Sequence, residues 1–184
     1  MTWLEDPNPI ALTPDQFEIE VKSLIEKSGL GLSQFSVQRL EKLEGPDGEY
    51  EIDVTARFSA LGADFLVLIE CKHYKNPVKR DVVQVLFDRL RAVGAHKGMV
   101  FSTAKFQRGA IKYAKLHGIA LVQITDGTTA FASRSHHTSH LLPANAPEHV
   151  GWVIDLSDDN RERYRLIYSP EPKALFPMLW GKNE

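Results

Sequence analysis

The chain has 184 residues, of which 43% are hydrophobic and 25% are charged, as is typical of one globular domain or of one domain with an appendage. Its single cysteine excludes an internal disulfide, and no apolar run reaches the ~20 residues that a membrane-spanning helix needs. The N-terminus shows no basic region followed by an apolar core, so we expect no signal peptide and a cytoplasmic protein.

The first predicted element is a helix that begins after Thr13. Thr13 suits the N-cap, Pro14 suits the first turn, and Gln16 completes a capping box. Apolar residues then recur with helical spacing up to Gly29, a typical C-cap residue, and they are Phe17, Val21, Leu24 and Ile25. The pattern predicts an amphipathic helix that ends at Gly29.

Three strands are predicted after this helix. Residues 35–43 form the first, and the turn residues Gly45-Pro-Asp-Gly48 lead into residues 49–58, where apolar and polar residues alternate. In this alternation the apolar residues from Tyr50 to Phe58 share one face, and Asp53 lies on the opposite, polar face. Residues 64–72 return as a nearly continuous apolar strand, which is typical of a central strand covered on both faces.

The remaining chain alternates helices and strands. Helical periodicity covers residues 82–93 and 107–117, and short apolar strands are predicted at 98–101 and 119–124. This β-α-β-α-β order predicts parallel strands with right-handed crossovers. We therefore expect an α/β fold, a mixed sheet flanked by helices with a small C-terminal β appendage. Its expected divisions are a core at 1–126, a linker or loop at 127–149, and a β-hairpin with a tail at 150–184.

Charge is unevenly distributed, although the net charge is only −2. Residues 72–115 contain eleven Lys or Arg and two acids, a local balance of +9, and the rest of the chain has a balance of −11. Such segregation is typical of a face that meets a polyanion. Clustering on solvated helices by chance is the alternative.

Glu70 and Lys72 interrupt the central apolar strand. Because they are two positions apart, their side chains leave the same face, about 6.6 Å apart along the strand. If the preceding strand is the neighbour, Asp53 can point into the same cleft. Converging carboxylates repel each other unless a cation such as Mg²⁺ lies between them, and an adjacent ammonium can position water or stabilise charge on a phosphate. The three residues suit metal-dependent phosphodiester hydrolysis.

Simpler interpretations exist for each of these residues. Glu70 and Lys72 could form an exposed ion pair, and Asp53 alone could be an ordinary solvated residue. Cys71 is expected to be a small buried residue rather than a nucleophile. The histidines at 136, 137 and 140 have a spacing compatible with a transition metal, but no second group of ligands accompanies them.

The element order and the motif Asp53…Glu70-Cys-Lys72 resemble the PD-(D/E)XK nuclease superfamily, and within it the Mrr-like restriction endonuclease family. The resemblance covers about residues 13–125 and includes Phe17-Glu18 in the first helix and the strand within 97–103. It implies a restriction-endonuclease-like fold and a DNA endonuclease that acts in restriction, defence or DNA repair.

The resemblance also implies roles for individual residues. Asp53, Glu70 and the backbone oxygen of Cys71 would bind Mg²⁺ or Mn²⁺, and Lys72 would assist the attacking water. Glu18 matches a first-helix glutamate that can join the site.

Two candidates stay open beside these residues. Helical angles alone do not distinguish Glu18 from Glu20. Gln84, on the helix after the motif, is a further polar candidate.

DNA is the expected partner, with RNA as an open alternative and no membrane. The cations expected to hold phosphates are Lys75, Lys79, Arg80, Lys105, Arg108 and Lys112. A homodimer would supply two active sites for double-strand scission, and a monomer is equally open. The alternative function is a nuclease-fold nucleic-acid-binding or scaffold module without catalysis, but such a module does not need the intact Asp53, Glu70 and Lys72.

Overall fold

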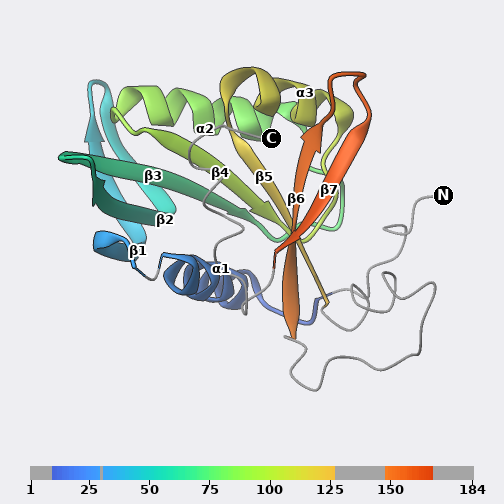
Figure 1. The fold of residues 1–184 in the computed structure, drawn as a ribbon, viewed down its shortest axis with the longest axis horizontal. Coiled ribbons are helices and arrows are strands. Elements are labelled where there is room, and N and C mark those ends of the chain that lie inside the picture. The colour runs from blue at the N-terminus through green and yellow to red at the C-terminus, as the bar shows by residue number, and fades with distance from the viewer. Residues whose placement is uncertain (1–9, 30, 127–147, 168–184) are drawn as a thin grey trace.

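The computed structural model describes residues 10–29, 31–126 and 148–167 (Figure 1). In that part of the chain, seven strands form one mixed sheet, with α1 on one face and α2 and α3 on the other. The elements in chain order are α1 (Pro14–Ser28), β1 (Ser33–Gly45), β2 (Gly48–Ala60), β3 (Ala63–Lys72), α2 (Arg80–Ala92), β4 (Lys97–Ser102), α3 (Arg108–His117), β5 (Ala120–Asp126), β6 (His149–Leu156) and β7 (Glu162–Ile167).

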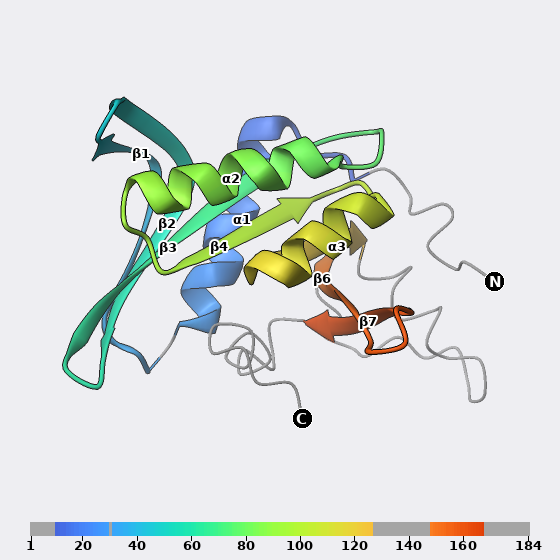
Figure 2. The ribbon, with the colours of Figure 1, turned by 90° about the horizontal axis from the view of Figure 1, so that it is seen from above.

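The strands follow one another across the sheet in chain order. β1, β2 and β3 are antiparallel, β3, β4 and β5 are parallel, and β5, β6 and β7 are antiparallel. The predicted parallel crossovers through α2 and α3 are therefore confirmed, and these two helices lie side by side over one face (Figure 2). The C-terminal hairpin is also confirmed, and it continues the same sheet beyond β5.

Most of the predicted linker, residues 127–147, lies outside the described residues, as do the three histidines within it. The division of the chain at residues 127–149 thus stays a prediction. None of the helices in the described ranges is long and apolar enough to span a membrane.

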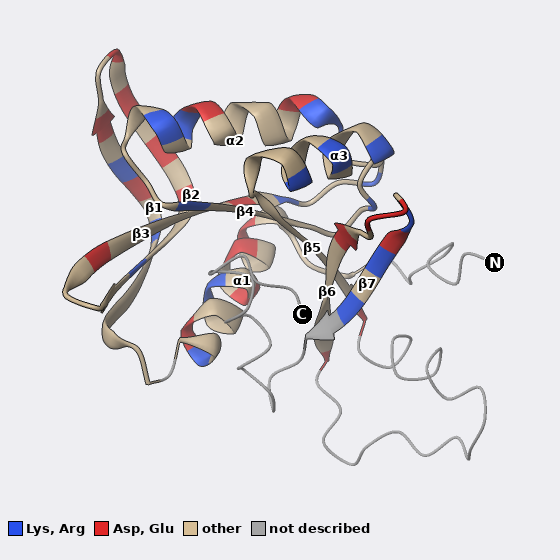
Figure 3. Ribbon diagram, turned by 45° about the horizontal axis from the view of Figure 1, so that its top comes forward, with Lys and Arg blue, Asp and Glu red and all other residues tan. Residues whose placement is uncertain are grey.

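Helix α1 begins and ends where the sequence predicts. The Thr13 hydroxyl accepts from the Gln16 N–H at 3.2 Å, and the Gln16 side chain accepts from the Thr13 N–H at 2.8 Å, which completes the capping box. Phe17, Val21 and Ile25 are buried against the sheet. Lys and Arg also recur on α2 and α3, across the sheet (Figure 3).

Two hydrophobic cores lie on the two faces of the sheet. The core under α1 includes Phe17, Val54 and Ile69, and the core under α2 and α3 includes Ile52 and Leu68. Leu68 and Ile69 are neighbours in β3, and both are fully buried. This burial confirms that β3 is a central strand covered on both faces.

The β1–β2 hairpin changes faces at Asp53. Ile52 belongs to the core under α2 and α3, whereas Val54 belongs to the core under α1. The prediction that Tyr50 to Phe58 share one face is therefore wrong for its first part. The cause lies in the backbone: the β2–β3 pairing reaches only as far as Val54, and Leu40, opposite Asp53 in β1, has a φ of 51° in the left-handed region. Asp53 thus lies where β2 separates from β3.

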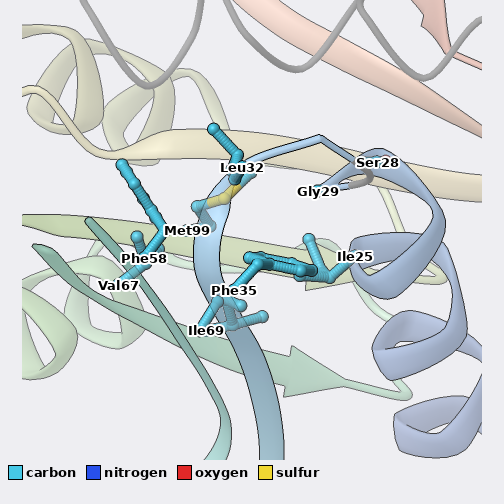
Figure 4. A pocket seen from close by; sticks show the side chains of 10 residues that line it. Ile25, Ser28, Gly29, Leu32, Phe35, Phe58, Val67, Ile69 and Met99 are labelled. Carbon is cyan, nitrogen blue, oxygen red and sulfur yellow. The ribbon is translucent and has the colours of Figure 1, made fainter. Parts of the chain in front are cut away.

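A small apolar pocket lies between the end of α1 and the sheet (Figure 4). Its lining includes Gly29 and Phe35, and a Cβ placed on Gly29 would lie 2.1 Å from the Phe35 ring. Gly29 has a φ of −87°, so the space for this ring explains the glycine better than a left-handed cap does.

We expect Gly29→Ala to lower the free energy of unfolding by about 1–3 kcal/mol, because the Phe35 ring must move. Urea unfolding measures the change. Gly109→Ala is the matched control, since Gly109 is exposed in α3 and a Cβ there meets nothing within 4 Å. Alanine is the better helix former there, so the control should be neutral or stabilising by up to about 1 kcal/mol. An unchanged Gly29→Ala protein would contradict the packing argument.

Candidate active site

Asp53, Glu70 and Lys72 lie together at the carboxyl end of β3. The Lys72 ammonium donates to Glu70 Oε1 at 2.5 Å, and the Cys71 N–H donates to Asp53 Oδ2 at 2.7 Å. Val54 and Ile69 are the last paired residues of β2 and β3, and Asp53 and Glu70 are their direct neighbours in the chain. The structure therefore brings together the three residues that the sequence singles out, across a gap of seventeen positions between the carboxylates.

The electrostatic surroundings of Asp53 are unfavourable to its charge. Burial and the nearby charge of Glu70 raise the pKa of Asp53 from 3.8 to about 6, while the hydrogen bond from Cys71 opposes the rise. Lys72 lowers the pKa and Glu18 raises it, with smaller effects. This carboxylate lacks a sufficient counter-charge, which is the condition that a bound cation relieves.

Glu70 is the only Asp, Glu, Lys or Arg that is buried within the described ranges. Its side chain is only 8% exposed, which excludes the alternative of an exposed ion pair with Lys72. Burial alone would lower the pKa of Lys72, but the charge and hydrogen bond of Glu70, together with Asp53, raise it above its ordinary value. Lys72 is thus held as a charged ammonium beside both carboxylates.

The first-helix glutamate also faces this site. Arg39 on β1 contacts Glu18 Oε2 at 2.7 Å and Asp15 Oδ1 at 2.6 Å, so the charge of Glu18 is partly neutralised. Glu20 instead lies 3.6 Å from the Nδ1 atom of His149. Of these two glutamates, Glu18 is the one whose charge raises the pKa of Asp53, and its place in the site stays a prediction.

The backbone of Cys71, rather than its thiol, faces Asp53. A strand residue directs its N–H and C=O to the same side, so the Cys71 carbonyl lies on the side to which its N–H binds Asp53. The side chain is buried in the core under α1, and burial raises the pKa of the thiol well above its ordinary value. The expectation of a buried cysteine is confirmed.

Two arginines of the site were missed by the sequence analysis. Arg89 on α2 contacts Glu70 Oε2 at 3.1 Å, and Arg39 holds Glu18. Arg89 follows the buried Leu86 by three positions, so a cation at the border of the apolar helix face is a signal that could have found it. No comparable pattern marks Arg39. Gln84 is half-buried on α2, and its place in the site stays a prediction.

The donor set fits a hard divalent cation. Within residues 10–29, 31–126 and 148–167, no group of three or more His, Cys, Asp or Glu side chains is arranged to hold a metal ion. Two carboxylates and a backbone carbonyl are nevertheless what Mg²⁺ uses, because this ion keeps several of its water ligands. Soft transition-metal ligands are missing from the set, so Mg²⁺ or Mn²⁺ suits it better than Zn²⁺ or Cu²⁺.

The predicted DNA-binding cations lie at the same end of the parallel strands as Lys72. The loops after β3 and β4 pair through Val78 and Phe106, which brings the starts of α2 and α3 together (Figure 3). Two cations have other contacts, since the Arg80 guanidinium lies 4.9 Å from the centre of the Tyr113 ring and Arg108 donates to the Asn160 carbonyl at 3.3 Å. Those that are exposed are Lys75, Lys79, Arg80, Arg108 and Lys112, and Lys105 is half-buried.

Comparison with known proteins identifies relatives of this chain. Residues 10–129 match the restriction endonuclease family model Mrr_cat. The type IV methyl-directed restriction enzyme EcoKMrr of Escherichia coli (strain K12) is 27% identical over 116 residues, which are 62% of this chain and 36% of that enzyme. The chain therefore matches only about a third of the relative's length.

Two solved structures are similar to part of this chain. A crystal structure of a protein of unknown function, AF1548, is 29% identical with a TM-score of 0.48 and covers 58% of this chain and 55% of its own. The DNA modification-dependent restriction endonuclease AspBHI is 20% identical to this chain, with a TM-score of 0.40. The match covers 62% of this chain and 28% of AspBHI. The family model spans well over half of the chain and includes the whole motif, so this protein belongs to the Mrr-like restriction endonuclease family of PD-(D/E)XK nucleases.

Proposed function

We propose that this protein is a Mg²⁺-dependent endonuclease that hydrolyses phosphodiester bonds in DNA. The observation that carries the proposal is the meeting of Asp53, whose pKa is raised to about 6, with the buried Glu70 and the charged Lys72. Two carboxylates in this state are poised to take up a divalent cation, and the lysine beside them suits a reaction that passes through an anionic phosphate.

The roles follow from the chemistry of each group. Asp53, Glu70 and the Cys71 carbonyl would hold the cation, which would supply Lewis acidity and lower the pKa of bound water. Lys72 would orient the attacking water and stabilise negative charge that develops on the phosphate. Glu18, held by Arg39, would add negative charge at the α1 side of the site.

DNA is the proposed substrate because the chain belongs to a restriction endonuclease family and carries exposed cations near the site. Contacts with phosphates should make binding weaken steeply as salt rises. EcoKMrr is methyl-directed, so methylated DNA is the first modified substrate to compare with unmodified DNA. Restriction, defence and repair all use this chemistry, and a homodimer would allow both strands to be cut.

We expect the protein to nick supercoiled plasmid with Mg²⁺ or Mn²⁺, and Lys72→Ala to slow nicking by at least about 100-fold. Gel assays of methylated and unmodified plasmid measure the rate, and a structured RNA tests the other substrate. DNA binding in Ca²⁺ should survive the substitution. Lys42→Ala is the control, since Lys42 is an exposed lysine on β1 that pairs with Glu49.

Two outcomes would contradict the proposal. Firm DNA binding without cleavage under any divalent ion would favour the nucleic-acid-binding or scaffold module. Cleavage by Lys72→Ala at the wild-type rate would remove the lysine from the chemistry.

A further inference from the structure

Glu70 is held by two cations rather than by one. Its Oε1 atom accepts from Lys72 at 2.5 Å, and its Oε2 atom lies 3.1 Å from the Arg89 guanidinium. Both oxygens are therefore engaged by side chains of the protein itself. Lys72 belongs to the motif of the family, whereas Arg89 comes from a different element, α2.

Arg89 is more exposed to solvent than the carboxylate that it contacts. Its side chain is 30% exposed, against 8% for Glu70. A partly exposed arginine can exchange its carboxylate for solvent at a smaller cost than a buried one.

Glu70 has a cationic partner for each of its two oxygens without any metal, whereas Asp53 has the Cys71 N–H and the nearby charge of Lys72. Asp53 and Glu70 carry two negative charges when ionised, and Lys72 and Arg89 carry two positive charges. A divalent cation beside Glu70 would meet the charges of Lys72 and Arg89 in a partly buried site, where like charges repel more strongly than in water. The contact that can be given up at least cost is that of Arg89, the most exposed of the partners of Glu70.

We propose that Arg89 is a built-in counter-ion that positions Glu70 in the metal-free protein and competes with the divalent cation for Glu70 Oε2. This inference rests on the proposed function, because it assumes that Asp53 and Glu70 take up the cation. If so, Arg89 weakens the binding of the metal ion. In return, it keeps Glu70 paired and in place when the ion is scarce.

The test is the affinity for Mn²⁺, followed by electron paramagnetic resonance of free Mn²⁺ in the absence of DNA. Arg89→Met should bind Mn²⁺ about fivefold more tightly than the wild type. Arg89→Lys, which keeps the charge, should bind like the wild type. Arg91→Met is the matched control, because Arg91 lies on the same helix and its guanidinium packs over the Phe87 ring at 5.9 Å. This control should leave the affinity unchanged.

The possible outcomes separate the two proposals. Equal or weaker Mn²⁺ binding by Arg89→Met would overturn the role of Arg89 while the metal site stands. Absence of Mn²⁺ binding in the wild type, or wild-type binding that Asp53→Asn leaves unchanged, would overturn the proposed function itself. If Arg89→Met does not fold, Arg89→Gln keeps hydrogen-bond donors without the charge and should show the same tighter binding.

Discussion

Asp53→Asn should stabilise the folded protein by about 2 kcal/mol at neutral pH while it abolishes cleavage. The rise of the Asp53 pKa from 3.8 to about 6 means that the folded state holds this charge reluctantly. Such a shift corresponds to about 3 kcal/mol, and the partial exposure of Asp53 reduces the effect that we expect to measure. Asparagine removes the charge at nearly the same size, and it also removes a proposed metal ligand.

The dependence on pH gives this prediction its sign. A carboxyl whose pKa is raised by folding contributes stability below its unfolded pKa, and this stability is lost as pH rises through the folded pKa. The free energies of unfolding of the variant and the wild type should therefore be nearly equal below pH 3.8. They should diverge as pH rises to about 6, and the variant should be the more stable protein above that pH.

Urea unfolding at a series of pH values measures this difference. Asp64→Asn is the control, since Asp64 is an exposed carboxylate at the start of the same strand, β3. Mg²⁺ should reduce the difference in stability between the variant and the wild type, because only the wild type is expected to bind it. A wild-type protein that is more stable than Asp53→Asn at every pH would contradict the prediction.

Glu70→Gln should have the opposite effect and destabilise the protein by about 2–3 kcal/mol. Glu70 is the shared anion of Lys72 and Arg89, whose side chains are 22% and 30% exposed. Removing one partner of a buried ion pair costs about 3–5 kcal/mol, because the other charge is left unpaired, and partial exposure of the two cations lowers this figure. Cleavage should be lost as well.

Thermal and urea unfolding at neutral pH measure this change. Glu26→Gln is the control, since Glu26 forms an exposed pair with Lys22 within one helix and should change stability by less than about 0.5 kcal/mol. A neutral or stabilising Glu70→Gln substitution would show that the two cations do not depend on this carboxylate. The neighbouring carboxylates of one site are thus expected to differ in the sign of their effect on stability.

Local patterns predicted most of the fold. The capping box of α1 and the apolar run of β3 depend on neighbours in the chain, so their outcome could be predicted from the sequence. The same holds for Glu70 and Lys72, because alternation in a strand fixes the face on which each side chain lies. The prediction that Asp53 joins these two residues required only the further assumption that β2 and β3 are adjacent. The structure confirms this assumption.

The remaining features depend on contacts between distant elements. Arg39 and Arg89 enter the site from β1 and α2, and charge alone does not show which carboxylate each arginine meets. The change of faces at Asp53 depends on the backbone of Leu40 in the neighbouring strand. Alternation cannot predict such a change, because leucine is not a residue that signals a left-handed conformation.

The C-terminal hairpin of β6 and β7 belongs to the smallest part of the chain that we expect to fold without aggregating. The family match ends at residue 129, yet β6 pairs with β5 along Leu121 to Asp126. A chain cut after β5 would bare a strand edge whose Leu121 and Val122 are fully or almost fully buried. Exposed apolar edges of this kind recruit other chains and aggregate. The β6–β7 hairpin therefore covers a strand edge of β5 that would otherwise be open to pairing with other chains.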